Sequence, residues 1–346
     1  MSVRSPWLAR LALLAAGSLV ALAELGARLL WPRREPPGGS EGLPVVEDVL
    51  ELATPHVRGI SHGVLHRTDR IGLRGPDYES VPPASVFRIA LAGDSIAMGH
   101  GVAEEDRYSD RLVPLLDAAR PRERHEVVNA ALSGLDARNV VLRLERALAE
   151  YRAHMLVYGF CVNDIEGPAY QRLAATQSTA LHWSRLRDIE RTPSRLWALL
   201  LALELRHELE GLPIAQEIRH NYFENPAAWS DFTRQLDRFA ALAAERGACP
   251  ILFVQPQLQQ LSDAHPYLDV YARVSRAAQE RGIHVVDAFD AFRGRVASWY
   301  WVSPADPHPN EAAHAVLARV LADGLLALPE RCWQRDVAPP SAASPR

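Results

Sequence analysis

The sequence predicts an α/β fold in which helices cover a five-stranded parallel sheet. Five short apolar runs have the length and composition of buried strands: residues 87–92, 125–130, 154–160, 250–255 and 283–287. Between them, residues 137–153 and 229–246 repeat apolar side chains at helical spacing. Strands that alternate with crossover helices form a doubly wound parallel sheet, and ligands bind beyond the carboxyl ends of its strands. We therefore expect the functional site just after these strands end.

Length, charge and cysteine content narrow the class of protein. A chain of 346 residues fits one large domain with additional termini. The net charge is −4, and the 38 Lys and Arg residues are scattered along the chain, so nucleic acid is not an expected partner. Cys161, Cys249 and Cys332 lie far apart, and their spacing indicates neither a disulfide framework nor a zinc site.

Residues 1–31 predict a membrane anchor or a signal segment. The uncharged run 11–23 is shorter than the roughly 20 residues that span a bilayer, unless Glu24 and Arg28 pair. Apolar residues resume after Glu24, which favours an uncleaved transmembrane helix with a tryptophan at each end. A signal peptide cleaved after the Ala-Leu-Ala at 21–23 and a soluble helix are the alternatives. With either an anchor or a signal peptide, the catalytic domain is expected to be periplasmic or otherwise extracytoplasmic.

The remaining chain divides by composition. Residues 32–66 begin with a stretch rich in Pro and Gly and predict a linker, residues 67–330 the main domain, and residues 331–346 a disordered tail. Within the domain, the connection 165–228 is long enough to predict a helical insertion. Its apolar segment 195–210 predicts either a lid or membrane-facing element, or a core helix packed on the sheet.

Polar residues with complementary chemistry follow the predicted strands. Ser95 follows the first strand, and His308 with Asp306 precedes the last helix. A serine hydroxyl becomes a useful nucleophile only beside a general base that a carboxylate orients, and these three residues can fill those roles. The backbone amides of Ser95 and Gly134 and the side-chain amide of Asn163 can hold the oxyanion of a tetrahedral intermediate.

The ordered series Ser95, Gly134, Asn163 and His308 resembles the four markers of the SGNH (GDSL) hydrolase superfamily. The resemblance runs from about residue 68 to 328 and implies a flavodoxin-like three-layer sandwich. The segment 67–78 and the N-terminal anchor are similar to a bacterial membrane-anchored branch. In the superfamily the orienting aspartate usually lies three residues before the histidine, whereas Asp306 lies two before it. Asp287 and Asp290 are therefore alternatives.

These residues predict a serine esterase that works through an acyl-enzyme without a cofactor or a metal. The expected substrate is an ester or O-acyl group on a small molecule, a glycan or a lipid-like compound. An O-acyltransferase acting on cell-envelope glycans is the first alternative, because the same residues could pass the acyl group to a sugar. A non-catalytic envelope scaffold is the second.

Overall fold

The computed structural model describes residues 6–31, 40–46, 48–165, 185, 189, 192–210 and 214–335. The chain divides into two compact units. The larger unit is built from residues 36–173, 213–302 and 307–346, and the smaller unit from residues 1–35, 174–212 and 303–306.

The larger unit contains the predicted five-stranded parallel sheet. Its strands, in spatial order, are β4 (Arg124–Asn129), β3 (Val86–Gly93), β5 (Met155–Phe160), β6 (Cys249–Val254) and β7 (His284–Asp287). In chain order this is 2-1-3-4-5, the flavodoxin-like arrangement, so the predicted fold class is confirmed. The central strands β3 and β5 are buried along their whole length, which explains their uninterrupted apolar sequences.

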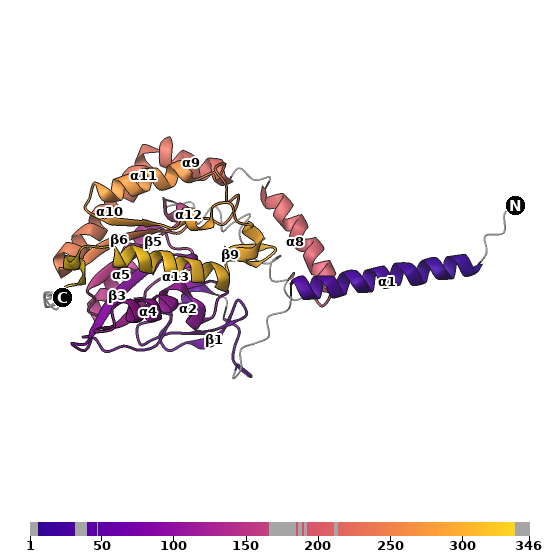
Figure 1. Ribbon diagram of the computed structural model, residues 1–346, viewed down its shortest axis with the longest axis horizontal. Coiled ribbons are helices and arrows are strands. Elements are labelled where there is room, and N and C mark those ends of the chain that lie inside the picture. The colour runs from indigo at the N-terminus through magenta and orange to yellow at the C-terminus, as the bar shows by residue number, and fades with distance from the viewer. Residues whose placement is uncertain are drawn as a thin grey trace. The chain divides into compact units, whose positions relative to one another are not determined.

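Helices cover both faces of this sheet (Figure 1). Those on one face are α4 (Tyr108–Ala119) and α13 (Glu311–Leu326), and those on the other are α5 (Ala137–Glu150), α10 (Pro226–Arg246) and α11 (Leu268–Gln279). The α5 and α10 helices confirm the helical periodicity of residues 137–153 and 229–246. Asp136 caps the first turn of α5, and Gly247 ends α10 in the left-handed conformation.

Part of the predicted linker is folded. Residues 48–67 form α2 (Val49–Leu52) and the hairpin of β1 (Arg58–Ser61) and β2 (Val64–Arg67), which corrects the linker prediction for this segment. The His66 ring, which is buried, donates a hydrogen bond of 3.0 Å to the Leu52 carbonyl and so joins the hairpin to α2. The Pro- and Gly-rich composition that suggested a linker ends before these elements begin.

A disulfide joins Cys249 at the start of β6 to Cys332 in the short helix η4 (Glu330–Trp333). The sequence analysis expected no disulfide, because 83 residues separate the two cysteines and only the tertiary fold brings them together. Trp333 is buried, with its ring centroid 5.0 Å from that of Phe87, so the domain extends past residue 331. Residues 336–346 of the predicted tail lie outside the described residues.

The smaller unit contains α1 (Pro6–Leu30) and α8 (Arg195–Glu210). The apolar window Leu13–Leu30 makes α1 a candidate membrane span. The α8 helix comes from the predicted insertion and buries its inner face in a cluster that includes Trp31 and Ala305. The later helix α9 (Ile214–Phe223) contributes to the core of the larger unit, while residues 166–184 lie outside the described residues.

Short elements complete the described chain. They are α3 (Ser95–Met98), η1 (Glu104–Asp106), η2 (Val162–Ile165), α12 (Phe289–Phe292), η3 (Ala297–Tyr300), β8 (Trp301–Ser303) and β9 (Asp306–Pro309).

Candidate active site

Ser95 is the first residue of α3, directly beyond the carboxyl end of β3. The preceding Asp94 caps this turn by accepting a hydrogen bond of 3.0 Å from the Ile96 N–H, so the serine hydroxyl is not used as the cap. Gly93 lets β3 approach β5 closely, because a Cβ there would lie 2.7 Å from the Gly159 carbonyl oxygen. Ser95 therefore lies at the edge of the sheet where strand order reverses, the usual place for a ligand in this fold.

His308 lies beside Ser95 although 213 positions separate them in the chain. Its Nε2 is 3.0 Å from Ser95 Oγ, within hydrogen-bond distance of a general base and its nucleophile. His308 is carried by β9 and is half-buried. The structure thus brings together the two residues that the sequence predicted as nucleophile and base.

Asp306 begins β9, two residues before His308, and is buried. Alternate residues of a strand point to the same side, so both side chains leave β9 on one face. The other predicted orienting residues are engaged elsewhere: Asp287 accepts a bond of 2.8 Å from the Phe289 N–H, and Asp290 pairs with Arg293 at 2.7 Å. Asp306 is therefore the carboxylate closest in sequence to His308 and the best placed along its strand.

The other two predicted oxyanion-hole residues follow the strands on either side of β3. Gly134 lies in the exposed turn between β4 and α5 with φ +75°, a conformation that favours glycine. Asn163 lies in η2, directly after β5, and its side chain is hydrogen-bonded to Asp94. The ends of β3, β4 and β5 thus place Ser95, Gly134 and Asn163 at the same edge of the sheet.

Buried hydrogen bonds fix the η2 segment. The Asp164 carboxylate accepts bonds from the Cys161 N–H at 3.1 Å and the Tyr158 hydroxyl at 2.9 Å. From α9, the Tyr222 hydroxyl donates to the Val162 carbonyl at 3.0 Å. These bonds hold the backbone on both sides of Asn163, so its position follows from the core rather than from a loose loop.

Burial governs the ionisable groups beneath Ser95. It raises the pKa of Asp94, an effect that the Ile96 N–H opposes. Burial, followed by repulsion from Asp94, raises the pKa of Asp164 well above its ordinary value. The pKa of Cys161 is also raised well above its usual range by burial, so this residue remains a thiol and is unsuited to act as a nucleophile.

A second histidine, which the sequence analysis did not select, packs on His308. The His100 ring is stacked on that of His308 with centroids 4.1 Å apart and an interplanar angle of 20°. The His62 ring packs against the His100 ring, and their centroids are 3.7 Å apart. His62 occupies the β1–β2 turn, where it and Gly63 both have positive φ, as in a type I′ hairpin. The only signal in the sequence was a histidine between two glycines shortly after Ser95.

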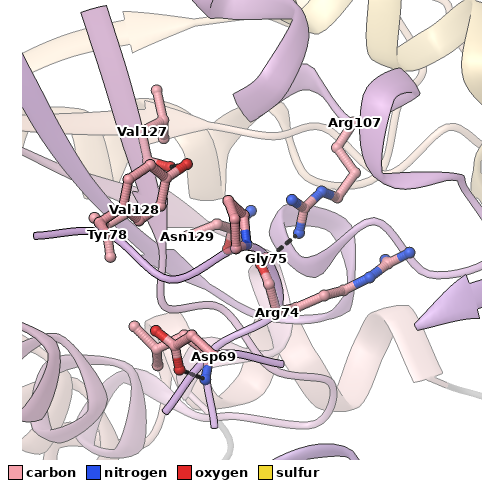
Figure 2. Close-up of a pocket in the computed structure, with 10 residues that line it drawn as sticks. Asp69, Arg74, Gly75, Tyr78, Arg107, Val127, Val128 and Asn129 are labelled. Carbon is pink, nitrogen blue, oxygen red and sulfur yellow. Dashed lines mark hydrogen bonds between the residues drawn. The ribbon is translucent and has the colours of Figure 1, made fainter. Parts of the chain in front are cut away.

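Two buried arginines hold the loop that carries His100. The Arg74 guanidinium donates to the carbonyls of Met98 and Gly99 at 2.8 Å each and to that of Val102 at 2.8 Å. Figure 2 shows Arg107 reaching the backbone beside Gly75, where it donates to the Arg74 carbonyl at 3.0 Å. The small pocket in this view is lined by these arginines and by β4, and none of the predicted catalytic residues lines it.

The described residues include two groups that could hold a metal ion by proximity alone. Cys249, His284 and Cys332 lie close together, but the two cysteines are joined as a disulfide and cannot ligate as thiolates. His100 and His308 are stacked face to face, an arrangement unlike that of two imidazoles directed at one ion.

Comparison with known proteins assigns the family. The model of the GDSL-like lipase/acylhydrolase family matches residues 91–316, which is more than half of the chain. No curated protein matches the chain. Similar solved structures include TesA, with 19% identity over 69% of this chain and 97% of that one and a TM-score of 0.43. A mutant of Axe2, an acetyl-xylooligosaccharide esterase from Geobacillus Stearmophilus, has 18% identity, with 69% and 94% covered and a TM-score of 0.44.

A third similar structure is a two-domain esterase (CEX) active on acetylated mannans, with 15% identity, 74% of this chain covered and a TM-score of 0.42. This chain spans about half of that esterase, 52% of its length. The family is assigned from the family-model match alone, because the three solved structures are too distant in sequence and structure to support an assignment. The chain belongs to the GDSL-like lipase/acylhydrolase family, within the SGNH superfamily, and is a serine hydrolase that acts on ester bonds.

Proposed function

We propose that the enzyme hydrolyses an ester or O-acyl group through an acyl-enzyme on Ser95. The observation that carries the proposal is the 3.0 Å separation between Ser95 Oγ and His308 Nε2 at the carboxyl edge of the sheet. As Ser95 Oγ attacks the carbonyl carbon, His308 accepts its proton and later gives it to the departing alkoxide. Water, deprotonated by His308, then attacks the acyl-enzyme and releases the acid and free Ser95.

The oxyanion is held by the backbone amides of Ser95 and Gly134 and by the Asn163 side chain. Asn163 can serve here because its NH₂ group has two donors and the bond to Asp94 occupies one of them. Asp306 orients His308 and stabilises the imidazolium, a role supported by its burial and by its position two residues away on β9.

A kinetic comparison of matched variants tests this proposal. Ser95→Ala and His308→Ala are each expected to lower kcat for p-nitrophenyl acetate by about 10³-fold or more. Ser133→Ala is the matched control, because Ser133 also follows a strand at the same edge of the sheet. Within the described part of the chain its hydroxyl donates to Met98 Sδ, at 3.6 Å, and to no histidine. Equal rates in the Ser95, His308 and wild-type proteins would overturn the mechanism.

Two further comparisons identify the orienting carboxylate and the substrate. Asp306→Asn is expected to lower kcat by 10²–10⁴-fold, as for a triad carboxylate, while Asp287→Asn leaves it nearly unchanged. The reverse result would assign the role to Asp287. Rates with acetyl, butyryl and octanoyl esters measure the preferred acyl length, and adding a sugar acceptor shows whether the acyl group passes to water or to a sugar.

We also propose that α1 is an uncleaved anchor and that the larger unit is extracytoplasmic. Leucine side chains are exposed along α1 from Leu11 to Leu30, as expected of a helix surrounded by lipid. Glu24 and Arg28 pair at 2.7 Å, the condition under which the apolar segment is long enough to span a bilayer. The Cys249–Cys332 disulfide fits an oxidising compartment.

Extraction of membranes with alkaline carbonate, followed by mass spectrometry of the intact protein, tests the anchor. The full chain with its first 23 residues is expected in the pellet. A protein that begins at Glu24 would show a cleaved signal peptide, and a full-length soluble protein would show that α1 is not an anchor.

A further inference from the structure

The α8 helix has an apolar inner face that is buried and an outer face on which large apolar side chains are exposed in the described part of the chain. Its inner face packs in the smaller unit's own cluster through Ala198, Ala202 and Leu205, all fully buried. Its outer face carries Trp197, Leu200 and Leu203, which are 57%, 49% and 46% exposed. These three residues are spaced three apart and form one row along the helix. Glu204 and His207 are exposed on the same side, in the later turns of the helix. A row of large apolar side chains on an exposed face is typical of a surface that contacts a membrane or another protein.

The first turn of α8 is bonded to α1 through Glu24. The Glu24 carboxylate accepts hydrogen bonds from the backbone N–H groups of Arg195 at 2.9 Å and Leu196 at 2.8 Å. It also accepts from the Ser194 hydroxyl at 2.8 Å and from Arg28 at 2.7 Å. A carboxylate at a helix N-terminus is favoured by the unpaired N–H groups and by the helix dipole. These bonds therefore hold the first turn of α8 beside Glu24, at the same depth along α1.

Helix geometry places Glu24 below the water-facing end of α1. Six residues separate Glu24 from Leu30, the last residue of α1, which is a rise of about 9 Å along the helix. The headgroup layer on each side of a bilayer is only about 5–8 Å thick. With Trp31 among the headgroups, Glu24 reaches the boundary with the acyl chains, and its four donors satisfy the carboxylate at that depth.

We propose that α8 lies in the membrane interface, with Trp197, Leu200 and Leu203 against the acyl chains of a phospholipid bilayer. The bilayer is the occupant that the structure favours, because the exposed row starts at the turn that is bonded to the candidate membrane span. The enzyme is then attached by two helices, one that crosses the bilayer and one that lies along its surface. This inference depends on the proposal that α1 is an uncleaved anchor.

Labels on single introduced cysteines in the full chain, reconstituted in phosphatidylcholine–phosphatidylglycerol vesicles, test it. Native labelling is not expected, because Cys161 is buried and the other two cysteines form the disulfide. An environment-sensitive NBD label is placed by Leu200→Cys on α8, by Val20→Cys on α1, and by Val81→Cys on the larger unit; all three native side chains are exposed. Quenching by doxyl-labelled lipid and by aqueous iodide is then measured.

The label at position 200 is expected to lose fluorescence to doxyl lipid as strongly as the label at position 20, while iodide quenches only the label at 81. Iodide quenching at 200 with lipid quenching retained at 20 would overturn the inference and leave the anchor intact. A label at 200 shielded from both quenchers would overturn it in favour of a protein partner or a second copy. Iodide quenching at both 20 and 200 would refute the anchor itself.

Discussion

Replacement of Arg74 tests how the buried framework supports the active site. Its guanidinium is almost completely buried and makes three hydrogen bonds of 2.8 Å, to the carbonyls of Met98, Gly99 and Val102. Hydrogen bonds to a charged group contribute about 1.5–3 kcal/mol each, which sets an upper limit of about 5–9 kcal/mol for the three. Burial and the nearby Arg107 oppose the charge and lower the pKa of Arg74, so the net contribution is smaller.

Arg74→Met is therefore expected to reduce the free energy of unfolding by about 3–5 kcal/mol, the usual cost of breaking a buried charged interaction. Arg74→Lys keeps the charge but cannot donate as a planar fork, so it is expected to fall between Met and the wild type. Because Gly99 adjoins His100, we also expect kcat for p-nitrophenyl acetate to fall in both variants. Urea unfolding gives the stability, and initial rates give kcat.

Arg146→Met provides the control. Arg146 is exposed, and its guanidinium donates a hydrogen bond of 2.9 Å to the Ile71 carbonyl. Its replacement is expected to change stability by no more than about 0.5 kcal/mol. If Arg74→Met unfolds at the same urea concentration as Arg146→Met and retains kcat, then Arg74 does not hold the His100 loop in the way that its hydrogen bonds suggest.

Three further predictions concern the stack, acid stability and the disulfide. His100→Ala is expected to lower kcat by roughly 10–100-fold, because it releases the His308 ring. His100→Phe keeps a stacked ring, so it is expected to retain most of the activity and to shift the pH profile. Equal losses of kcat in the two variants would refute a positioning role for His100. Burial lowers the pKa of His154 to about 4, below the 6.5 of the unfolded chain, so stability is lost as the pH falls below 6.5. By pH 5 this histidine costs about 2 kcal/mol, and His154→Gln should reduce the loss of stability between pH 7 and 5 in urea unfolding by up to that amount. The share from His66 and His314, whose pKa values burial also lowers, should remain. Cys249→Ser should lower the free energy of unfolding by up to about 4.5 kcal/mol, because the bond to Cys332 closes a loop of 83 residues and so restricts the unfolded chain. An unchanged urea midpoint would show that the disulfide does not form.

The sheet and the proximity of Ser95 to His308, the proposed nucleophile and base, could be predicted from sequence for one physical reason. Buried parallel strands are short apolar runs, and their carboxyl ends meet at one edge, so the polar residues that follow them are expected to meet there. Ser95 and His308 fit this expectation, since their side chains lie 3.0 Å apart. Glu24 and Arg28 form the ion pair that a membrane span of this length requires, at 2.7 Å.

Other features depend on tertiary contacts that leave no local pattern. The cysteines of the disulfide are 83 residues apart and meet only after β6 and η4 pack. His100 sits in a glycine-flanked loop whose path is set by Arg74, so its contact with His308 could not be read from spacing. The β1–β2 hairpin was hidden because its short strands follow a segment rich in proline and glycine.

Covalent labelling of the nucleophile tests the central claim most directly. A fluorophosphonate ester phosphonylates an activated serine, and mass spectrometry of the digested protein identifies the modified residue. The expected adduct is on Ser95 alone, formed more slowly in His308→Ala and absent in Ser95→Ala. An adduct on another serine such as Ser133, or equal labelling of Ser95→Ala and the wild type, would contradict the account.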